Sequence, residues 1–149
     1  MYSPKTGITR SACVARVQKA LSDVGVKLGD RVVTSRDSDF LKLREVLTID
    51  KTPEITQWQL PFSIGPDDAA QASEGAQLFV LMSQPNAKID THSHSEGVSF
   101  HFVASGSAIV GGTELVAGDW WYVPTGKTYS FEAGPQGATT LGCHYCCCG

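Results

Sequence analysis

The chain has 149 residues, of which 18% are charged and 42% hydrophobic, and its formal net charge is −3. This length fits one compact domain, and the aromatic and β-branched content excludes an intrinsically disordered chain. Apolar runs reach about five residues, far fewer than the ~20 that cross a bilayer, so we expect no membrane partner. Residues 61–149 hold two cations and eight acids, a net charge of −6, which argues against nucleic-acid binding.

We expect residues 1–52 to form a helical extension that packs on the rest of the chain. Apolar residues spaced by three and four predict a helix over 9–28, with Thr9 or Ser11 as its N-cap and Gly25 near its end. Residues 38–49 predict a second short helix, and a strand through the second half of this run is the alternative.

The first residues do not resemble a secretion signal, because Arg16 and Lys19 interrupt any apolar stretch. We therefore expect a cytoplasmic location, where cysteine thiols stay reduced. Four of the five cysteines lie close to the C-terminus, and Cys143 and Cys146 form a single CxxC pair. Because zinc usually takes four ligands, this pair favours a thiol-rich tail, with a soft-metal or redox tail as the alternative.

From residue 53 onward the pattern changes to short strands separated by glycine and proline turns. An edge strand is predicted over 55–61 and a polar loop over 65–75. Eight further strands are predicted at 76–83, 86–92, 98–105, 107–110, 113–116, 119–123, 127–132 and 138–147. Such a series fits a β-sandwich or a small barrel, and we assign residues 53–149 to it.

The strongest chemical signal is the pair His92 and His94, near the end of a predicted strand. Residues i and i+2 of a strand point to the same face, so both imidazoles can address one point inside a barrel. Imidazole is a common ligand of transition metals. Alone, this two-histidine pattern is weak.

Its context resembles the two sequence motifs of the cupin superfamily, over about residues 76–147. The matching residues are His92, His94, Gly106, Gly118, Pro124 and Gly126. The resemblance implies a mainly β fold, the cupin double-stranded β-helix or jelly-roll barrel, here with an N-terminal helical extension. It also implies a site inside the barrel.

Two positions depart from the family pattern: Ser99 stands where the family usually has Glu, and Tyr129 where it usually has His. In one interpretation other residues complete the metal site. His101 shares the inward face of the strand that carries Ser99, and the last strand of the family fold would bring His144 close to it. His92 and His94, joined by His101, His144 or both, would then bind a divalent transition metal such as Fe, Zn, Ni or Mn. In the other interpretation the metal is lost.

Two further residues are candidates for catalysis. Tyr129 is expected to donate a hydrogen bond to the substrate or to a metal-bound oxygen. Glu96 is a candidate to bend into the site as a ligand or base, and a solvated residue of the turn is the alternative. Of Trp120 and Trp121, which are neighbours on one strand, one must face inward and the other outward.

We therefore predict a metal-dependent small-molecule enzyme of the cupin type. A dioxygenase or cyclase that acts on an aromatic or polyketide-like oxygenated compound is favoured, and a homodimer is expected because cupins often dimerise. The alternatives are a cupin that binds a small ligand without catalysis, and a metal-free isomerase or epimerase.

Overall fold

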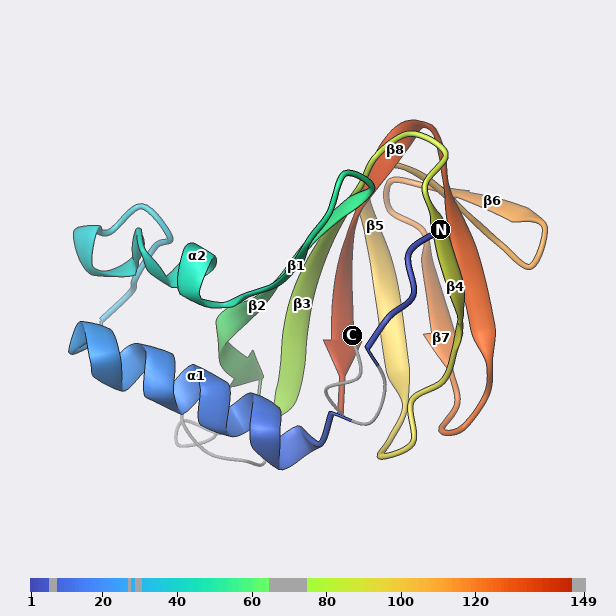
Figure 1. Cartoon of the computed structure of the whole chain (residues 1–149). Coiled ribbons are helices and arrows are strands. Elements are labelled where there is room, and N and C mark those ends of the chain that lie inside the picture. The colour runs from blue at the N-terminus through green and yellow to red at the C-terminus, as the bar shows by residue number, and fades with distance from the viewer. Residues whose placement is uncertain (6–7, 27, 29–30, 65–74, 146–149) are drawn as a thin grey trace.

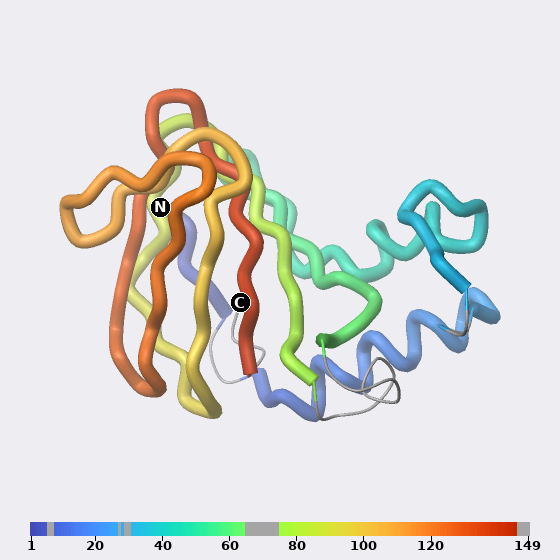
Figure 2. Tube along the Cα trace, turned by 180° about the vertical axis from the view of Figure 1, so that it is seen from behind, coloured from blue at the N-terminus to red at the C-terminus, as the bar shows by residue number. Residues whose placement is uncertain are grey.

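The computed structural model describes residues 1–5, 8–26, 28, 31–64 and 75–145, in which an antiparallel sheet curls into a barrel beside two helices (Figures 1 and 2). The strands are β1 Thr48–Lys51, β2 Ile55–Ile64, β3 Ala76–Ser83, β4 Lys88–His92, β5 Ser99–Val110, β6 Thr113–Val116, β7 Trp120–Val123 and β8 Tyr129–His144. They pair in the order β1-β2-β3-β8-β5-β6, while β4 pairs with β8 and β7 pairs with β5. The mainly β barrel with an N-terminal helix is therefore confirmed.

The long strands β5 and β8 pair along most of their length and link the two sides of the barrel. Their register shifts on both sides of Gly106, which has a φ of 70°. A Cβ atom at Gly106 would lie 2.0 Å from the carbonyl oxygen of Gly137, so only glycine permits this close approach. The predicted breaks at 105–107 and 133–137 are wrong, because the chain continues through both as strand.

Helix α1, Arg10–Val24, has the predicted ends. The Thr9 side chain accepts a hydrogen bond from the Ala12 backbone N–H at 3.2 Å, and Gly25 ends the helix with a φ of 71°. These are the expected N-cap and left-handed C-cap.

The predicted helix over 38–49 is only partly correct. A 3-10 turn at Ser38–Phe40 and the short helix α2, Leu43–Val46, precede β1. The alternative, a strand in the second half of this run, therefore holds for its last residues.

Strand β1 lies at the edge of the sheet, so the prediction of an edge strand over 55–61 is wrong. Pro61 is tolerated in the inner strand β2 because the β2–β3 register shifts between Gln59 and Ser63. The division at residue 52 stays a prediction; β1 before it and β2 after it pair directly.

The two largest of the four apolar clusters in the described part of the chain are a barrel core and a helical core. The barrel core contains Tyr2, Ile55, Ile89, Val103, Ala108, Trp121, Val123 and Phe131. The helical core contains Val17, Ala20, Leu21, Phe40, Leu43 and Leu47, and both helices lie beside β2 (Figure 1). Trp121 is buried while Trp120 is 63% exposed, which confirms the predicted inward and outward pair.

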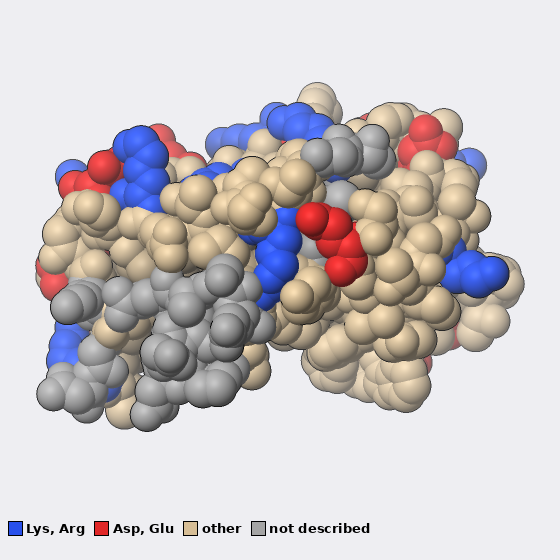
Figure 3. All heavy atoms as spheres, turned by 90° about the horizontal axis from the view of Figure 1, so that it is seen from below, with Lys and Arg blue, Asp and Glu red and all other residues tan. Residues whose placement is uncertain are grey.

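Charged side chains are sparse on the barrel. Seen from below, wide areas of its side of the molecule carry no Lys, Arg, Asp or Glu (Figure 3). None of the described helices is long and apolar enough to cross a membrane.

Cys13 is fully buried and disulfide-bonded, whereas free thiols were expected. Spacing in the sequence does not show such a bond, because it depends on the distance between Cα atoms in the fold. Cys143 is a free thiol. The other C-terminal cysteines, at 146–148, and the predicted loop over 65–75, apart from Gly75, lie outside the described residues, and the cytoplasmic location stays a prediction.

Candidate metal centre

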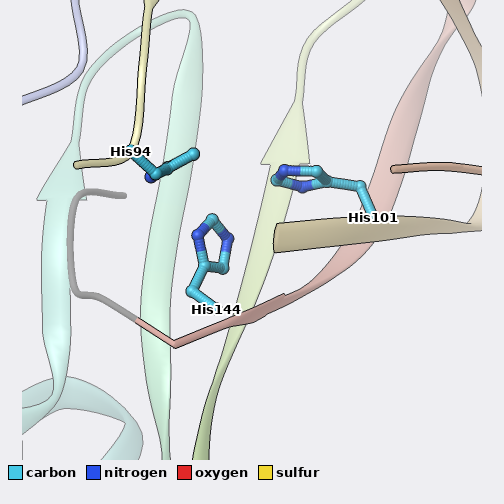
Figure 4. A group of neighbouring side chains, drawn as sticks. All are labelled: His94, His101 and His144. Carbon is cyan, nitrogen blue, oxygen red and sulfur yellow. The ribbon is translucent and has the colours of Figure 1, made fainter. Parts of the chain in front are cut away.

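Three histidines from different parts of the barrel meet in its interior. His94 lies two residues beyond β4, His101 lies in β5 and His144 ends β8. Each offers one ring nitrogen, and these three atoms lie within 4.8 Å of one another. Figure 4 shows the three rings around a common space. All three side chains are buried, and their spacing is compatible with a single bound cation.

Strand register and one glycine bring His101 and His144 together. β5 and β8 pair so that Ser99 faces His144, while His101 faces Gly142. A Cβ atom on Gly142 would lie 2.6 Å from His144 Nε2 and 3.3 Å from His101 Nδ1. Because position 142 has no side chain, the ring centroids of His101 and His144 approach to 4.9 Å. His144 thus enters the site directly opposite the serine that replaces the usual glutamate.

Tyr129 connects two of these rings. Its hydroxyl lies 3.1 Å from His94 Nε2 and 2.9 Å from His101 Nε2. A hydroxyl has one hydrogen, so it donates to one ring and accepts from the N–H of the other. Tyr129 therefore couples the protonation of His94 to that of His101 and holds both rings in place.

His92 lies beside the group of three rather than in it. Its Nδ1 lies 2.8 Å from the Asp90 carbonyl oxygen, and its ring centroid lies 4.4 Å from that of Tyr129 and 5.4 Å from that of His94. Of the four predicted ligands, the structure brings His94, His101 and His144 together and places His92 against Tyr129.

Glu96 does not reach the histidines. It is exposed, and its Oε2 accepts a hydrogen bond from the Arg10 backbone N–H at 2.7 Å. A carboxylate is stabilised there because the N-terminus of α1 carries partial positive charge. The expected catalytic role of Glu96 therefore has no support in the structure. The sequence did not show this, because residues 10 and 96 meet only in the folded chain.

Several buried polar atoms of the described barrel have no hydrogen-bond partner. They are Gln57 Oε1, His94 Nδ1, Ser99 Oγ, Trp121 Nε1, Thr140 Oγ1 and His144 Nδ1. Buried polar groups are normally paired, so such atoms call for an explanation. A transition metal binds the lone pair of an imidazole nitrogen, and the unpaired Nδ1 atoms of His94 and His144 offer one when the ring proton is on Nε2. The donor set therefore fits a metal ion.

Burial keeps these rings uncharged. Desolvation, together with repulsion from the neighbouring histidines, lowers the pKa of His94 to about 4 and that of His101 to about 3. The same causes lower the pKa of His144 well below its ordinary value, and desolvation also lowers the pKa of His92. At neutral pH the rings are neutral, which is the form that binds metals.

A small cavity adjoins the cluster. Its walls include Gln57, His101, Tyr129 and His144, and no Lys, Arg, Asp or Glu is among the described residues that line it. Its free volume is about 20 Å³, which is room for about one water molecule. Sequence reasoning missed Gln57, although its position two residues after the buried Ile55 marks it as inward-facing.

Tyr2 closes one side of this cavity. Its backbone N–H donates to the Lys88 carbonyl at 2.8 Å, and its carbonyl accepts from the Asp90 N–H at 2.7 Å, which adds the N-terminal segment to β4. Its hydroxyl donates to Asp50 Oδ2 at 2.6 Å. Sequence reasoning also missed Tyr2, and no pattern around it signalled this position.

The fold is similar to that of known structures. KdgF from Halomonas sp. matches with a TM-score of 0.52 and 16% identity, over 78% of this chain and 94% of that chain. A point variant of oxalate decarboxylase from Bacillus subtilis matches with a TM-score of 0.53 and 22% identity, over 62% of this chain and 26% of that chain. An RmlC-like cupin from Shewanella frigidimarina has a TM-score of 0.48 and 16% identity, over 64% of this chain and 79% of that chain.

At these identities the likeness concerns the fold alone, and the predicted cupin fold is confirmed. No protein-family model and no curated protein matches the sequence.

Proposed function

We propose that this chain, which has the cupin fold, is a metal-dependent enzyme that acts on a small oxygenated organic compound. The observation that carries the proposal is the group of three buried, neutral histidines, two of which have an unpartnered ring nitrogen. His94, His101 and His144 would hold a divalent Fe, Zn, Ni or Mn ion. Bound there, such a metal supplies Lewis-acid chemistry or, in the case of Fe, a binding position for O2.

The lining of the cavity supports an aromatic or polyketide-like substrate. Phe79, Leu81, Ile89 and Phe131 provide apolar walls. A neutral ligand set leaves the charge of a divalent ion uncompensated, which favours enolate-like oxygen ligands. This suits dioxygenase or cyclase chemistry, in which Tyr129 would pass a proton between the substrate and its two histidine partners.

The solved structures with a similar fold support an enzymatic function for this chain, but they do not indicate that it shares their substrates. The name of oxalate decarboxylase shows that one chain with this fold acts on oxalate. A small dianion is best recognised by cationic side chains, and none is among the described residues that line the cavity here. We therefore propose a substrate that is neutral or carries one negative charge.

A substrate larger than water requires movement of the segment that closes the cavity. Tyr2 and Pro4 line it, and the free volume is about 20 Å³. The N-terminal segment crosses the barrel beside β4 and not within the main ladder of the sheet (Figure 1). We propose that it withdraws when the substrate enters.

Elemental analysis of the full chain tests the metal site. Protein reconstituted separately with each of the four ions should hold stoichiometric metal with at least one of them. His101→Ala and His144→Ala should lose it. His92→Ala, which removes a ring that packs against Tyr129 and His94 but lies outside the group of three, should weaken binding by about 10–100-fold at most. Stoichiometric metal in His144→Ala, or none in the reconstituted wild type, contradicts the proposal.

The hydrogen bonds of Tyr129 favour a second candidate, a metal-free isomerase or epimerase. A tyrosine hydroxyl bonded to two imidazoles is a plausible acid–base pair without any metal. The two candidates differ in their response to a chelator, which abolishes activity only in the metal enzyme. A metal-free protein that retains an apolar ligand and has no activity would instead indicate a binding protein.

We also propose a homodimer that forms through the outer face of the sheet. A row of apolar residues crosses five paired strands: Trp58, Val80, Leu141, Phe102 and Trp120. On β5 and β7, Phe100, Phe102, Trp120 and Tyr122 are 40%, 38%, 63% and 54% exposed.

These four rings expose about 400 Å² in total, roughly half of the ~800 Å² that each partner of a stable complex buries. Aromatic enrichment without charge is typical of homodimer interfaces, so a second copy of this chain is the proposed occupant.

A further inference from the structure

We propose that Gln57 of β2 is a substrate-binding residue that accepts a hydrogen bond from the substrate. The inference rests on the proposed function only in that the cavity beside the histidines is taken as the substrate site. Gln57 lines this cavity together with His101, Tyr129 and His144. Its strand pairs with β3, where Gln57 faces Leu81, another wall of the cavity.

The carboxamide of Gln57 is buried without a partner for its oxygen. The residue is 5% exposed, and Oε1 has no hydrogen-bond donor in the described structure. An amide oxygen removed from water without a donor destabilises the folded chain. A residue that destabilises the protein in this way is expected at a binding site, where the ligand satisfies it.

Gln59 provides a comparison for Gln57 on the same strand. It lies two residues further along the same strand and is 1% exposed. Its Nε2 donates to Gln77 Oε1 at 2.8 Å, and its Oε1 accepts from Arg16 Nε at 3.3 Å. The same residue type, on the same inward face, is therefore satisfied by the protein at position 59 and left unsatisfied beside the cavity.

The unpaired atom is an acceptor, which defines the chemistry of its partner. Only an O–H or N–H group can pair with Gln57 Oε1. Leu81 and Phe79, which share the cavity, supply no donor. The substrate therefore carries a hydroxyl, an enol or an N–H group in addition to the oxygens that approach the metal site. A site built for such a group discriminates strongly against an analogue that lacks it.

Unfolding of the metal-free full chain gives a first test, which does not depend on activity. Gln57→Leu replaces the unpaired amide by an apolar side chain of similar size, so its thermal midpoint should equal or exceed that of the wild type. Gln59→Leu is the matched control and should lower the midpoint, because it leaves Gln77 and Arg16 without this partner. A midpoint that falls as far in Gln57→Leu as in Gln59→Leu overturns the proposal.

Binding gives a second test with two probes that differ in one donor. Acetohydroxamic acid has an N–H group, and N-methylacetohydroxamic acid does not. Titrated into cobalt-loaded protein and followed by the cobalt absorption spectrum, the N–H probe should bind about tenfold more tightly to the wild type. Gln57→Leu should bind both probes equally well. A preference caused only by the extra methyl group of the second probe would persist in this variant. A preference that persists there overturns the proposal.

If neither probe enters the cavity, the titration is repeated with Tyr2→Ala added to the wild type and to Gln57→Leu, because this substitution removes a side chain that lines the cavity. Protein that binds no cobalt would overturn the proposed metal site, and the comparison of the Gln57→Leu and Gln59→Leu midpoints would still decide the role of Gln57.

Discussion

Over residues 99–102, the two faces of strand β5 have the opposite character to that of an ordinary barrel strand. Ser99 and His101 point inward and are buried, whereas Phe100 and Phe102 point outward and are 40% and 38% exposed. A strand with one face in water normally turns its apolar residues to the core. The inversion shows that folding alone explains neither face: the inner one has the composition of a binding site, and the outer one has that of an interface.

The largest expected effect concerns the inner face and pH. In the folded, metal-free protein the pKa values of His94 and His101 are about 4 and about 3, below the ordinary 6.5. As pH falls below about 6.5, the unfolded chain takes up protons that the folded chain does not. The free energy of unfolding should therefore fall between about pH 7 and pH 3, by about 1.4 kcal/mol for each unit of pKa difference.

Denaturant unfolding of the metal-free protein across this pH range measures the effect. His101→Gln removes one of the buried imidazoles and should show a flatter pH dependence. An equal pH dependence in the variant and the wild type would show that His101 does not cause the loss of stability at low pH.

A change on the outer face should act on association and not on folding. Trp120→Lys places a charge on the aromatic face, where Trp120 is 63% exposed in the single chain and is the most exposed of the four rings. Because aromatic residues at the centre of interfaces contribute about 2 kcal/mol or more, the dimer dissociation constant should rise by about 30-fold or more. Sedimentation equilibrium measures this constant.

The control for this prediction is Val116→Lys, since Val116 on β6 is 53% exposed and lies outside the aromatic row. It should leave the dissociation constant unchanged. A wild-type protein that is monomeric at high concentration would show that the exposed aromatic residues do not form a homodimer interface.

A methyl group at position 142 should disturb the inner face alone. In Gly142→Ala the new Cβ would lie 2.6 Å from His144 Nε2, so the ring must move. Overpacking of this kind costs about 1–3 kcal/mol, and metal affinity should fall because His144 is displaced. Thermal unfolding and metal titration report the two effects. Cys143→Ala changes the next residue, on the other face of β8, and should leave metal affinity unaltered; a similar loss in both variants would contradict this account.

The smallest effect is expected where Tyr2 closes the cavity. Tyr2→Phe keeps the ring but removes the hydrogen bond to Asp50, which should lower stability by about 1 kcal/mol. A chelator should then remove the metal a few times faster, because the closing segment is held less firmly. Stopped-flow mixing with a coloured chelator measures the rate. Ser3→Ala removes the exposed bond to Asp90 instead and should change the rate less; equal rates in the wild type and Tyr2→Phe would show that Tyr2 does not control access.

Much of the fold was predictable because its signals are local. The caps of α1 at Thr9 and Gly25 depend only on the residue types at the two ends of the helix. Alternation along one strand placed His101 inside, and it required one of Trp120 and Trp121 to face out. The cupin fold was predicted from a resemblance to the motifs of that family, which glycines, a proline and two histidines carry.

Strand continuity was less predictable. The glycines near residues 106 and 137 indicated turns, yet β5 and β8 continue through them, because the pairing of the two strands stabilises a bend that each strand alone would not keep.

Only the tertiary structure decided which side chains make up the site. The register of β5 against β8 places His144 opposite Ser99, so that a histidine from the last strand joins the group inside the barrel. Glu96 accepts a hydrogen bond from the backbone N–H of Arg10 at the N-terminus of helix α1, and Tyr2 and Gln57 line the cavity. Periodicity is a property of a few neighbouring residues and can be read from the sequence. The meeting of residues 2, 57, 94, 101 and 144 depends on the pairing of strands that are distant along the chain, and that pairing is determined by the packing of the whole barrel.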